Sequence, residues 1–205
     1  MILFIMNQNF LKNKNYNDIN SDNIFYRCFL HEDCSNNDKK YIENYEKDKK
    51  PIELKNFAYM TINYKNKPVY VTTPIMTNLW KLTKAPWQIY LQFTNLDNDN
   101  EMEKFYNFIK KIEDEQLSIL GCKKNDYLSQ IRQDKEKKYE PNLCVKIPFL
   151  YNKFDCEILN DNYSAMSIMN INNFQKMQCD IYIDKIWKFN GNYICKWKCK
   201  KIYIR

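Results

Sequence analysis

Hydrophobic and polar residues alternate over residues 177–205, on both sides of Asn190-Gly191. Alternation with a period of two places each set of side chains on its own face of a β-strand. Asn-Gly is the preferred pair for the tight turn of a β-hairpin. The chain is therefore expected to end in a hairpin with one buried face. The side chains expected on that face are Met177, Cys179, Ile181, Ile183, Tyr193, Cys195, Trp197 and Cys199.

The alternation of the last strand slips by one residue at Lys200-Lys201, after which Ile202 and Ile204 form the apolar set. A slip of one residue is what a β-bulge produces, and bulges bend the strands of small barrels. Before the slip, Lys196, Lys198 and Lys200 alternate with the buried set. These three lysines are expected to project from the opposite face of the strand.

Further strands are predicted on both sides of the middle of the chain. Runs rich in β-branched and aromatic residues predict strands at 57–64, 68–73 and 87–93. Two later runs, at 143–149 and 153–159, predict strands that precede the terminal hairpin.

One clear helix is predicted between these two groups of strands. Apolar residues recur at helical spacing over residues 102–120. Asp97 or Asp99 is expected to cap the N-terminus, and Gly121 lies where a helix end favours a left-handed backbone. A second, weaker helix is predicted at 126–137.

Three strands, a helix and a closing hairpin follow the element order of an OB-fold, the fold of many oligonucleotide-binding proteins. The chain is therefore expected to be mainly β with one or two helices. The specific prediction is a five-stranded Greek-key barrel with a helix between strands three and four. A β-sandwich with a helical insertion is the alternative.

The N-terminal quarter of the chain has a different composition. Residues 7–50 are dominated by Asn, Asp, Lys and Tyr, with scattered apolar residues, and the predicted arm spans residues 1–50. Such a segment is expected to form a loosely ordered polar arm. With Pro51 as the boundary, residues 51–205 form the predicted OB-fold domain.

The net charge of +7 resides in the terminal hairpin. Residues 185–205 hold seven Lys and Arg and no Asp or Glu, while the rest of the chain is balanced. A basic, aromatic hairpin on a neutral body predicts contact with an anionic partner. The alternative is that lysines protect exposed strands from aggregation.

The cysteines do not form a disulfide or metal framework. Cys195 and Cys199 lie four residues apart on one strand, about 13 Å between Cα atoms, which is too far for a disulfide or a shared metal. Cys28, His31 and Cys34 supply three potential zinc ligands without an evident fourth, so no metal or other cofactor is expected. Without a signal peptide or a long apolar run, the chain is expected to be soluble and intracellular.

The hydrophobic and turn positions of residues 55–205 resemble the single-stranded DNA-binding proteins of nucleocytoplasmic large DNA viruses. Those proteins are similar in fold to the OB-type single-strand binders of short-tailed bacteriophages. The matching positions are Ile62, Tyr64, Asn66, Lys67, Pro68, Val69, Tyr70, Val71, Thr73, Pro74 and Met76, followed by Ile186, Trp187, Phe189, Asn190, Gly191, Tyr193, Trp197, Lys201 and Ile202. The phage proteins end in an acidic tail, whereas this chain ends in basic residues.

A catalytic site is not expected, because the only histidine is in the arm and no catalytic motif occurs. Single-strand binding needs lysines for phosphates and rings for unpaired bases. The stacking candidates are Tyr70, Trp80, Tyr90 and Phe189, while Trp87, Trp187 and Trp197 are expected in the core. The phosphate-contact candidates are Lys65, Lys67, Lys81, Lys84, Lys188, Lys196, Lys198 and Lys200.

The sequence and the resemblance together predict a non-catalytic protein that binds single-stranded DNA during viral replication, recombination or repair. It would act in the host cytoplasm or a viral replication compartment, with self-association along DNA as a further expectation. An RNA-binding relative is a weaker alternative. From another class, a viral scaffolding protein would use the barrel for protein contacts.

Overall fold

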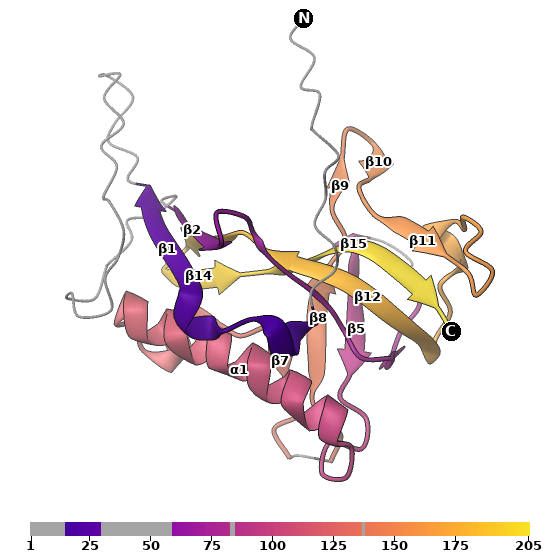
Figure 1. Cartoon of the computed structure of the whole chain (residues 1–205), viewed down its shortest axis with the longest axis horizontal. Helices are drawn as coiled ribbons and strands as arrows, with labels where there is room; N and C mark the ends of the chain where they lie inside the picture. Colours follow the sequence, from indigo (N-terminus) through magenta and orange to yellow (C-terminus); the bar gives the residue numbers. More distant parts are fainter. Residues whose placement is uncertain (1–14, 30–58, 83–84, 137) are drawn as a thin grey trace, which may run out of the picture.

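The computed structural model describes residues 15–29, 59–82, 85–136 and 138–205 (Figure 1). The described chain is mainly β, with one long helix. The strands of its larger sheet are β3 (Val69–Thr72), β4 (Met76–Asn78), β5 (Gln88–Gln92), β7 (Ile131–Arg132), β8 (Asn142–Lys146), β11 (Glu157–Leu159), β12 (Gln175–Ile183) and β15 (Trp197–Ile204).

Five strand units of this sheet close into a barrel. β3 and β4 are one bent strand, since both pair with β12, and the backbone N–H of Thr73 between them still donates to Cys179 of β12. From there the ring continues through β5, β8 and β15, and returns to β12. Only the pairing of β8 with β15 is parallel among these contacts. A closed sheet leaves no free edges in the ring.

The connections around the barrel form a Greek key. Numbered by their order along the chain, the five strands follow one another around the ring as first, second, third, fifth and fourth. The fourth strand therefore lies beside the first. This arrangement confirms the predicted OB-like barrel. The helix α1 (Asn100–Leu120) follows the three predicted strand segments, as the sequence indicates.

One detail of the predicted topology needs correction. The strand predicted at 57–64 is β2 (Tyr59–Tyr64), and it pairs with β1 (Ile24–Phe29) and β13 (Lys185–Phe189) instead of joining the ring. The helix therefore falls between the second and third strands of the barrel, and not between strands three and four. The cause is that β1 and β13 both offer β2 an antiparallel partner outside the barrel.

A second sheet, in the order β1-β2-β13-β14-β6, lies beside the barrel. Its last two strands are β14 (Asn192–Cys195) and β6 (Tyr127–Leu128). The predicted terminal hairpin is present and belongs to both sheets: β12 and β15 form its base in the barrel, and β13 and β14 form its tip around Asn190-Gly191. The predicted bulge is present as well, because β12 pairs with Lys201 and then with Cys199, leaving Lys200 as the extra residue.

The predicted second helix at 126–137 is wrong. Its start is a single 3-10 turn, Lys124–Asp126, followed by β6 and β7. Tyr127 is buried and pairs with Tyr193 of β14, whereas Leu128 is exposed. β6 pairs with β14 at the edge of the second sheet, and β7 pairs with β8 at the edge of the larger sheet. These tertiary pairings outweigh the weak helical pattern of the segment.

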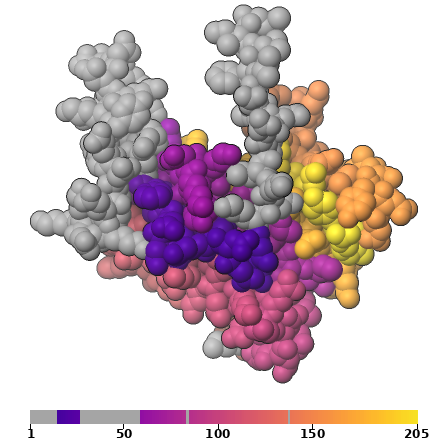
Figure 2. All heavy atoms as spheres, in the orientation of Figure 1, coloured from indigo at the N-terminus to yellow at the C-terminus, as the bar shows by residue number. Residues whose placement is uncertain are grey.

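Part of the predicted N-terminal arm is integral to the structure. Residues 15–29 form two 3-10 turns and β1, and they cover one side of α1, as the indigo residues of Figure 2 show. The ring of Tyr16 packs edge-on against Phe105 at 5.1 Å, and its hydroxyl donates to the Glu101 carbonyl. The expected loose order is therefore wrong for these residues. The boundary at Pro51 lies outside the described chain and stays a prediction.

The helix is fixed at both ends and along its buried side. Asp99 accepts from the backbone N–H groups of Glu101 and Met102, and Gly121 ends the helix with φ of 55°, as predicted. Glu113 faces inward and accepts from the Ser129 hydroxyl at 2.6 Å and from the Gln130 backbone N–H at 2.7 Å. This buried carboxylate anchors the connector between β6 and β7 to the helix.

The variant Trp197→Ala is expected to cost about 3–5 kcal/mol of unfolding free energy, because the ring is only 2% exposed inside the barrel. The melting temperature should fall by roughly 6–20 °C for a chain of this size. Phe25→Ala, at a 55% exposed ring, is the control and should change stability by less than about 1 kcal/mol. Equal destabilisation in both variants would contradict a core role for Trp197.

The variant Glu113→Gln tests the buried carboxylate through pH. Burial raises the pKa of Glu113 above its ordinary 4.5, so the folded state holds this proton when the unfolded state has released it. The contribution of Glu113 to stability is therefore largest below about pH 4.5 and declines as pH rises through the folded pKa. Urea unfolding should show wild type becoming less stable relative to the Gln variant as pH rises. Asp114→Asn, next along the helix, controls for the removal of a charge.

Candidate nucleic-acid interface

The outer face of β5 and β8 is polar because the two strands alternate in register. Ile89 and Leu91 of β5, and Leu143 and Val145 of β8, point into the barrel and are fully buried. The residues between them point outward in three cross-strand pairs. These pairs are Gln88 with Lys146, Tyr90 with Cys144, and Gln92 with Asn142.

A lysine-rich cavity of about 470 Å³ lies at the Lys146 end of this face. We call it the lysine cavity. Most of its wall comes from the tip of the terminal hairpin, which the pairing of β15 with β8 brings close to Lys146. The lining residues are Lys146, Lys185, Trp187, Lys188, Phe189, Ile194, Lys196 and Lys198.

The charges in the lysine cavity are poorly compensated. Of Lys146, Lys185, Lys196 and Lys198, only Lys198 forms an ion pair within the described chain, with Asp184 at 2.7 Å. The pKa of Lys146 is lowered, first by partial burial and then by the nearby charges of Lys196 and Lys198. A bound anion would relieve this repulsion, so the cavity favours a negatively charged ligand.

The opposite end of the same face carries aromatic side chains. A second cavity of about 470 Å³, the aromatic cavity, is lined by Leu79, Trp80, Gln92, Arg132, Gln133, Asp134, Tyr139, Glu140, Asn142 and Phe174. Trp80 is 55% exposed, and its ring lies edge-on to Tyr90 at 5.0 Å. This contact joins the aromatic cavity to the middle of the face.

Cys144 lies between the two cavities, and charged residues from both cavities influence the pKa of its thiol. Burial raises the pKa of its thiol, while Arg132 from the aromatic cavity and Lys196 from the lysine cavity oppose that rise. The outer face of β5 and β8 runs from Lys146 in the lysine cavity to Asn142 in the aromatic cavity, and we call this face with its two cavities the β5–β8 groove. Its basic groups and exposed rings are the two components that single-strand binding requires.

The structure brings together about half of the residues predicted for the site. Trp80 is at the aromatic end of the groove and Tyr90 is in its middle. Lys81 follows Trp80, and its backbone N–H donates to the Asn173 side chain next to Phe174. Lys84 lies outside the described residues. The predicted residues that line the lysine cavity are Lys188, Phe189, Lys196 and Lys198.

Lys65, Lys67 and Tyr70 line neither cavity. The two lysines flank the turn between β2 and β3, and because β2 leaves the barrel, this turn is not the loop between its first two strands. That loop is 79–87, after β4. Tyr70 is stacked on Tyr182 of β12 at 6.3 Å, on another side of the barrel.

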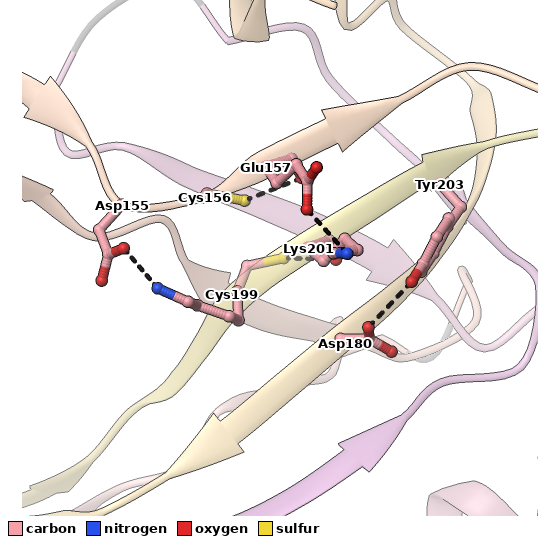
Figure 3. A network of polar contacts seen from close by, with 8 residues as sticks. Asp155, Cys156, Glu157, Asp180, Cys199, Lys201 and Tyr203 are labelled. Carbon is pink, nitrogen blue, oxygen red and sulfur yellow. Dashed lines mark hydrogen bonds and ion pairs between the residues drawn. The ribbon is translucent and has the colours of Figure 1, made fainter. Parts of the chain in front are cut away.

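Lys200 is also outside the groove. It forms an ion pair with Asp155 at 2.5 Å, in a polar network where β11 pairs with β15 (Figure 3). In the same network Lys201 pairs with Glu157 at 2.7 Å, and the Tyr203 hydroxyl donates to Asp180. Lysines of one strand thus differ in charge compensation, since Lys200 and Lys201 are both paired with carboxylates.

Several residues of the groove were not predicted. Trp187 was expected in the core, yet it is 41% exposed and packs against Tyr59 at 5.1 Å on the outer face of the second sheet. Period-two alternation along β8 would have placed Lys146 outward, so its position had a signal in the sequence. The remaining unpredicted lining residues with charged or aromatic side chains are Arg132, Asp134, Tyr139, Glu140, Phe174 and Lys185.

No protein-family model matches this chain, and no curated protein matches it. Among solved structures, it is similar to the single-stranded DNA-binding protein from bacteriophage Enc34 in complex with ssDNA. The TM-score is 0.46 and the identity 11%, over 71% of this chain and 89% of the phage chain. Two further structures of that protein, one without ssDNA in its name and one with a C-terminal truncation, give TM-scores of 0.45 and 0.46, at 14% and 11% identity. They match 71% of this chain and 84% and 87% of their own. Similarity of this degree assigns no family and no function.

The described residues contain no evident metal or membrane feature. No group of three His, Cys, Asp or Glu there could hold a metal ion, and His31 and Cys34 lie outside that part of the chain. The six cysteines with described side chains are free thiols. No described helix is long and apolar enough to cross a membrane.

The variant Lys196→Gln is expected to raise the pKa of Lys146, because it removes the like charge that lowers this pKa most. Titration of the Lys146 side chain by NMR measures the shift. Lys188→Gln is the matched control: Lys188 lines the same cavity, but the charges that shift the Lys146 pKa most are those of Lys196, Lys198 and Asp184. An equal shift in both variants would show that the repulsion is spread evenly over the cavity.

Proposed function

We propose that this chain binds single-stranded DNA in the β5–β8 groove and has no catalytic role. The observation that carries the proposal is the juxtaposition of uncompensated lysines with exposed aromatic rings on one face of a closed barrel. Lys146, Lys185 and Lys196 have no carboxylate partner within the described chain. Such lysines are suited to phosphates, and nearby rings to bases.

The aromatic side chains favour a single strand over a duplex. A ring can stack on a base only when the base face is exposed, which a paired and stacked duplex prevents. Trp80 and Phe174 at one end of the groove, and Phe189 at the other, are each about half or more exposed. A duplex could contact the lysines but would leave these rings unused.

The proposed biological setting follows from the resemblance described for the sequence. A protein of this kind would coat unpaired DNA during viral replication, recombination or repair, inside the infected cell. Self-association along the strand and recruitment of replication proteins are further proposals.

The double variant Lys146→Ala with Lys196→Ala tests the groove. It should weaken binding to a labelled oligothymidine longer than the ~4–16 nucleotides that one OB-fold spans. The log–log dependence of affinity on salt should flatten by about 1.4, since each of the two phosphate contacts that the variant removes contributes ~0.7 on a single strand. Fluorescence anisotropy at several salt concentrations measures both quantities.

The double variant Lys65→Ala with Lys67→Ala is the matched control, because it removes the same charge from the turn between β2 and β3. It should leave the salt dependence nearly unchanged. A duplex of equal length and an oligouridylate complete the experiment. Equal, weak binding to single-stranded and duplex DNA would contradict the proposal, and clear preference for the oligouridylate would redirect it to RNA.

A further inference from the structure

Three exposed aromatic residues have a left-handed backbone, which is unfavourable for bulky side chains. Tyr151, Tyr163 and Phe174 have φ of 49°, 58° and 55°. Their side chains are 96%, 66% and 70% exposed, respectively. Contact between Cβ and the backbone makes this conformation uncommon for residues other than Gly, Asn and Asp. These positions therefore combine an unfavourable backbone with a solvent-exposed ring.

At most other left-handed positions of the described chain, the sequence uses a residue that tolerates this conformation. Those positions are Asn66, Asn95, Asn152, Asn190, Gly121 and Gly191, with Lys65 as the exception. Asparagine is abundant in this chain, so it was available for the three aromatic positions too. An exposed aromatic ring at such a position therefore indicates a role in function and not in stabilising the fold.

Of the three rings, Phe174 lies in the β5–β8 groove, and Tyr151 lies on a hairpin that starts at the other end of it. Phe174 lines the aromatic cavity together with Trp80. Its loop is held there by the Asn173 side chain, which accepts from the Lys81 backbone N–H at 2.7 Å. This places the Phe174 ring beside the surface that the proposed DNA strand would occupy.

Tyr151 occupies the turn of the hairpin formed by β9 (Phe149–Leu150) and β10 (Lys153–Phe154). This hairpin starts three residues after Lys146 and projects beyond the end of β8 (Figure 1). Its base packs against Trp87, next to Gln88 of β5, with Phe149 at 5.9 Å and Phe154 at 5.1 Å. The hairpin therefore rises from the Lys146 end of the groove, with Tyr151 at its tip.

Tyr163 has the same backbone conformation but a different location. Its ring packs edge-on against Tyr203 at 6.4 Å, beside the paired strands β11 and β15. Like Tyr151 it lines neither cavity, but its loop follows β11, which pairs with β15 and not with β5 or β8. Tyr163 thus serves as an internal control for backbone effects without a place in the groove.

We propose that Tyr151 and Phe174 stack on bases of single-stranded DNA at the two ends of the β5–β8 groove. The inference rests on the proposed function and extends it, because it lengthens the binding path beyond the barrel face onto the β9–β10 hairpin. Each ring would hold a base where the strand leaves the lysine-lined or aromatic part of the groove. Stacking of this kind tolerates any base, since every base has an aromatic face.

The test replaces each ring with asparagine in the full chain: Tyr151→Asn, Phe174→Asn and Tyr163→Asn. Asparagine suits the left-handed backbone, so none of the three variants should have a lower melting temperature than wild type. Tyr151→Asn and Phe174→Asn should each weaken oligothymidine binding by about 5- to 150-fold, the equivalent of ~1–3 kcal/mol for one stacked base. Tyr163→Asn should bind as wild type does.

Conservative replacements separate stacking from other effects. Tyr151→Phe and Phe174→Tyr keep a ring at each position and should retain nearly full affinity. An abasic oligomer, which keeps the sugars and phosphates but has no bases, should bind wild type and the asparagine variants equally, because it offers no base to stack on. These results, with unchanged melting temperatures, would support the inference.

The possible failures are distinguishable. If wild type binds the oligothymidine and both asparagine variants bind equally well, the inference is overturned while the proposed function stands. If all three asparagine variants bind more weakly to the same extent, the effect is not specific to the groove ends, and the inference is again overturned. If wild type and the Lys65/Lys67 control do not bind any single strand, the proposed function fails, and the inference fails with it.

Discussion

The parallel pairing of β15 with β8 is the contact on which the barrel and the groove both depend. It joins Trp197 to Val145 and Lys198 to Lys146, and it closes a ring that would otherwise be an open, twisted sheet. Because β15 continues from the terminal hairpin, the same pairing fixes where the hairpin tip lies relative to the barrel. The cluster of lysines around Lys146 is thus a consequence of barrel closure, and not of proximity in the sequence.

Local structure was largely predictable because its causes are local. Period-two alternation identified the buried side of the terminal hairpin, including Trp197, and a one-residue slip identified the bulge at Lys200. Gly121 and Asp99 marked the ends of the helix. What the sequence did not reveal was partner choice between strands. β2 has a regular strand pattern, yet nothing in that pattern says that it pairs with β1 and β13 outside the barrel.

The same limit explains which site residues were predicted correctly. Lysines look alike in a sequence, and their electrostatic environment depends on carboxylates that lie far away along the chain. Lys200 meets Asp155, and Lys198 meets Asp184, while Lys196 between β14 and β15 meets no carboxylate of the described chain. Strand alternation gives the face on which a lysine lies. It does not give the charge opposite that lysine, which depends on the packing of separate segments.

The groove also shows how binding requirements and stability oppose one another in this chain. Partial burial and then repulsion from Lys196 and Lys198 lower the pKa of Lys146, and aromatic side chains at left-handed turns are unfavourable for the backbone. The barrel tolerates both because its stability comes from elsewhere, namely the closed ring and the fully buried side chains of β5, β8 and β12. The unfavourable features lie in loops and at strand ends, outside the buried core of the barrel. A rigid closed barrel therefore allows its surface to be adapted for a ligand while the fold is kept.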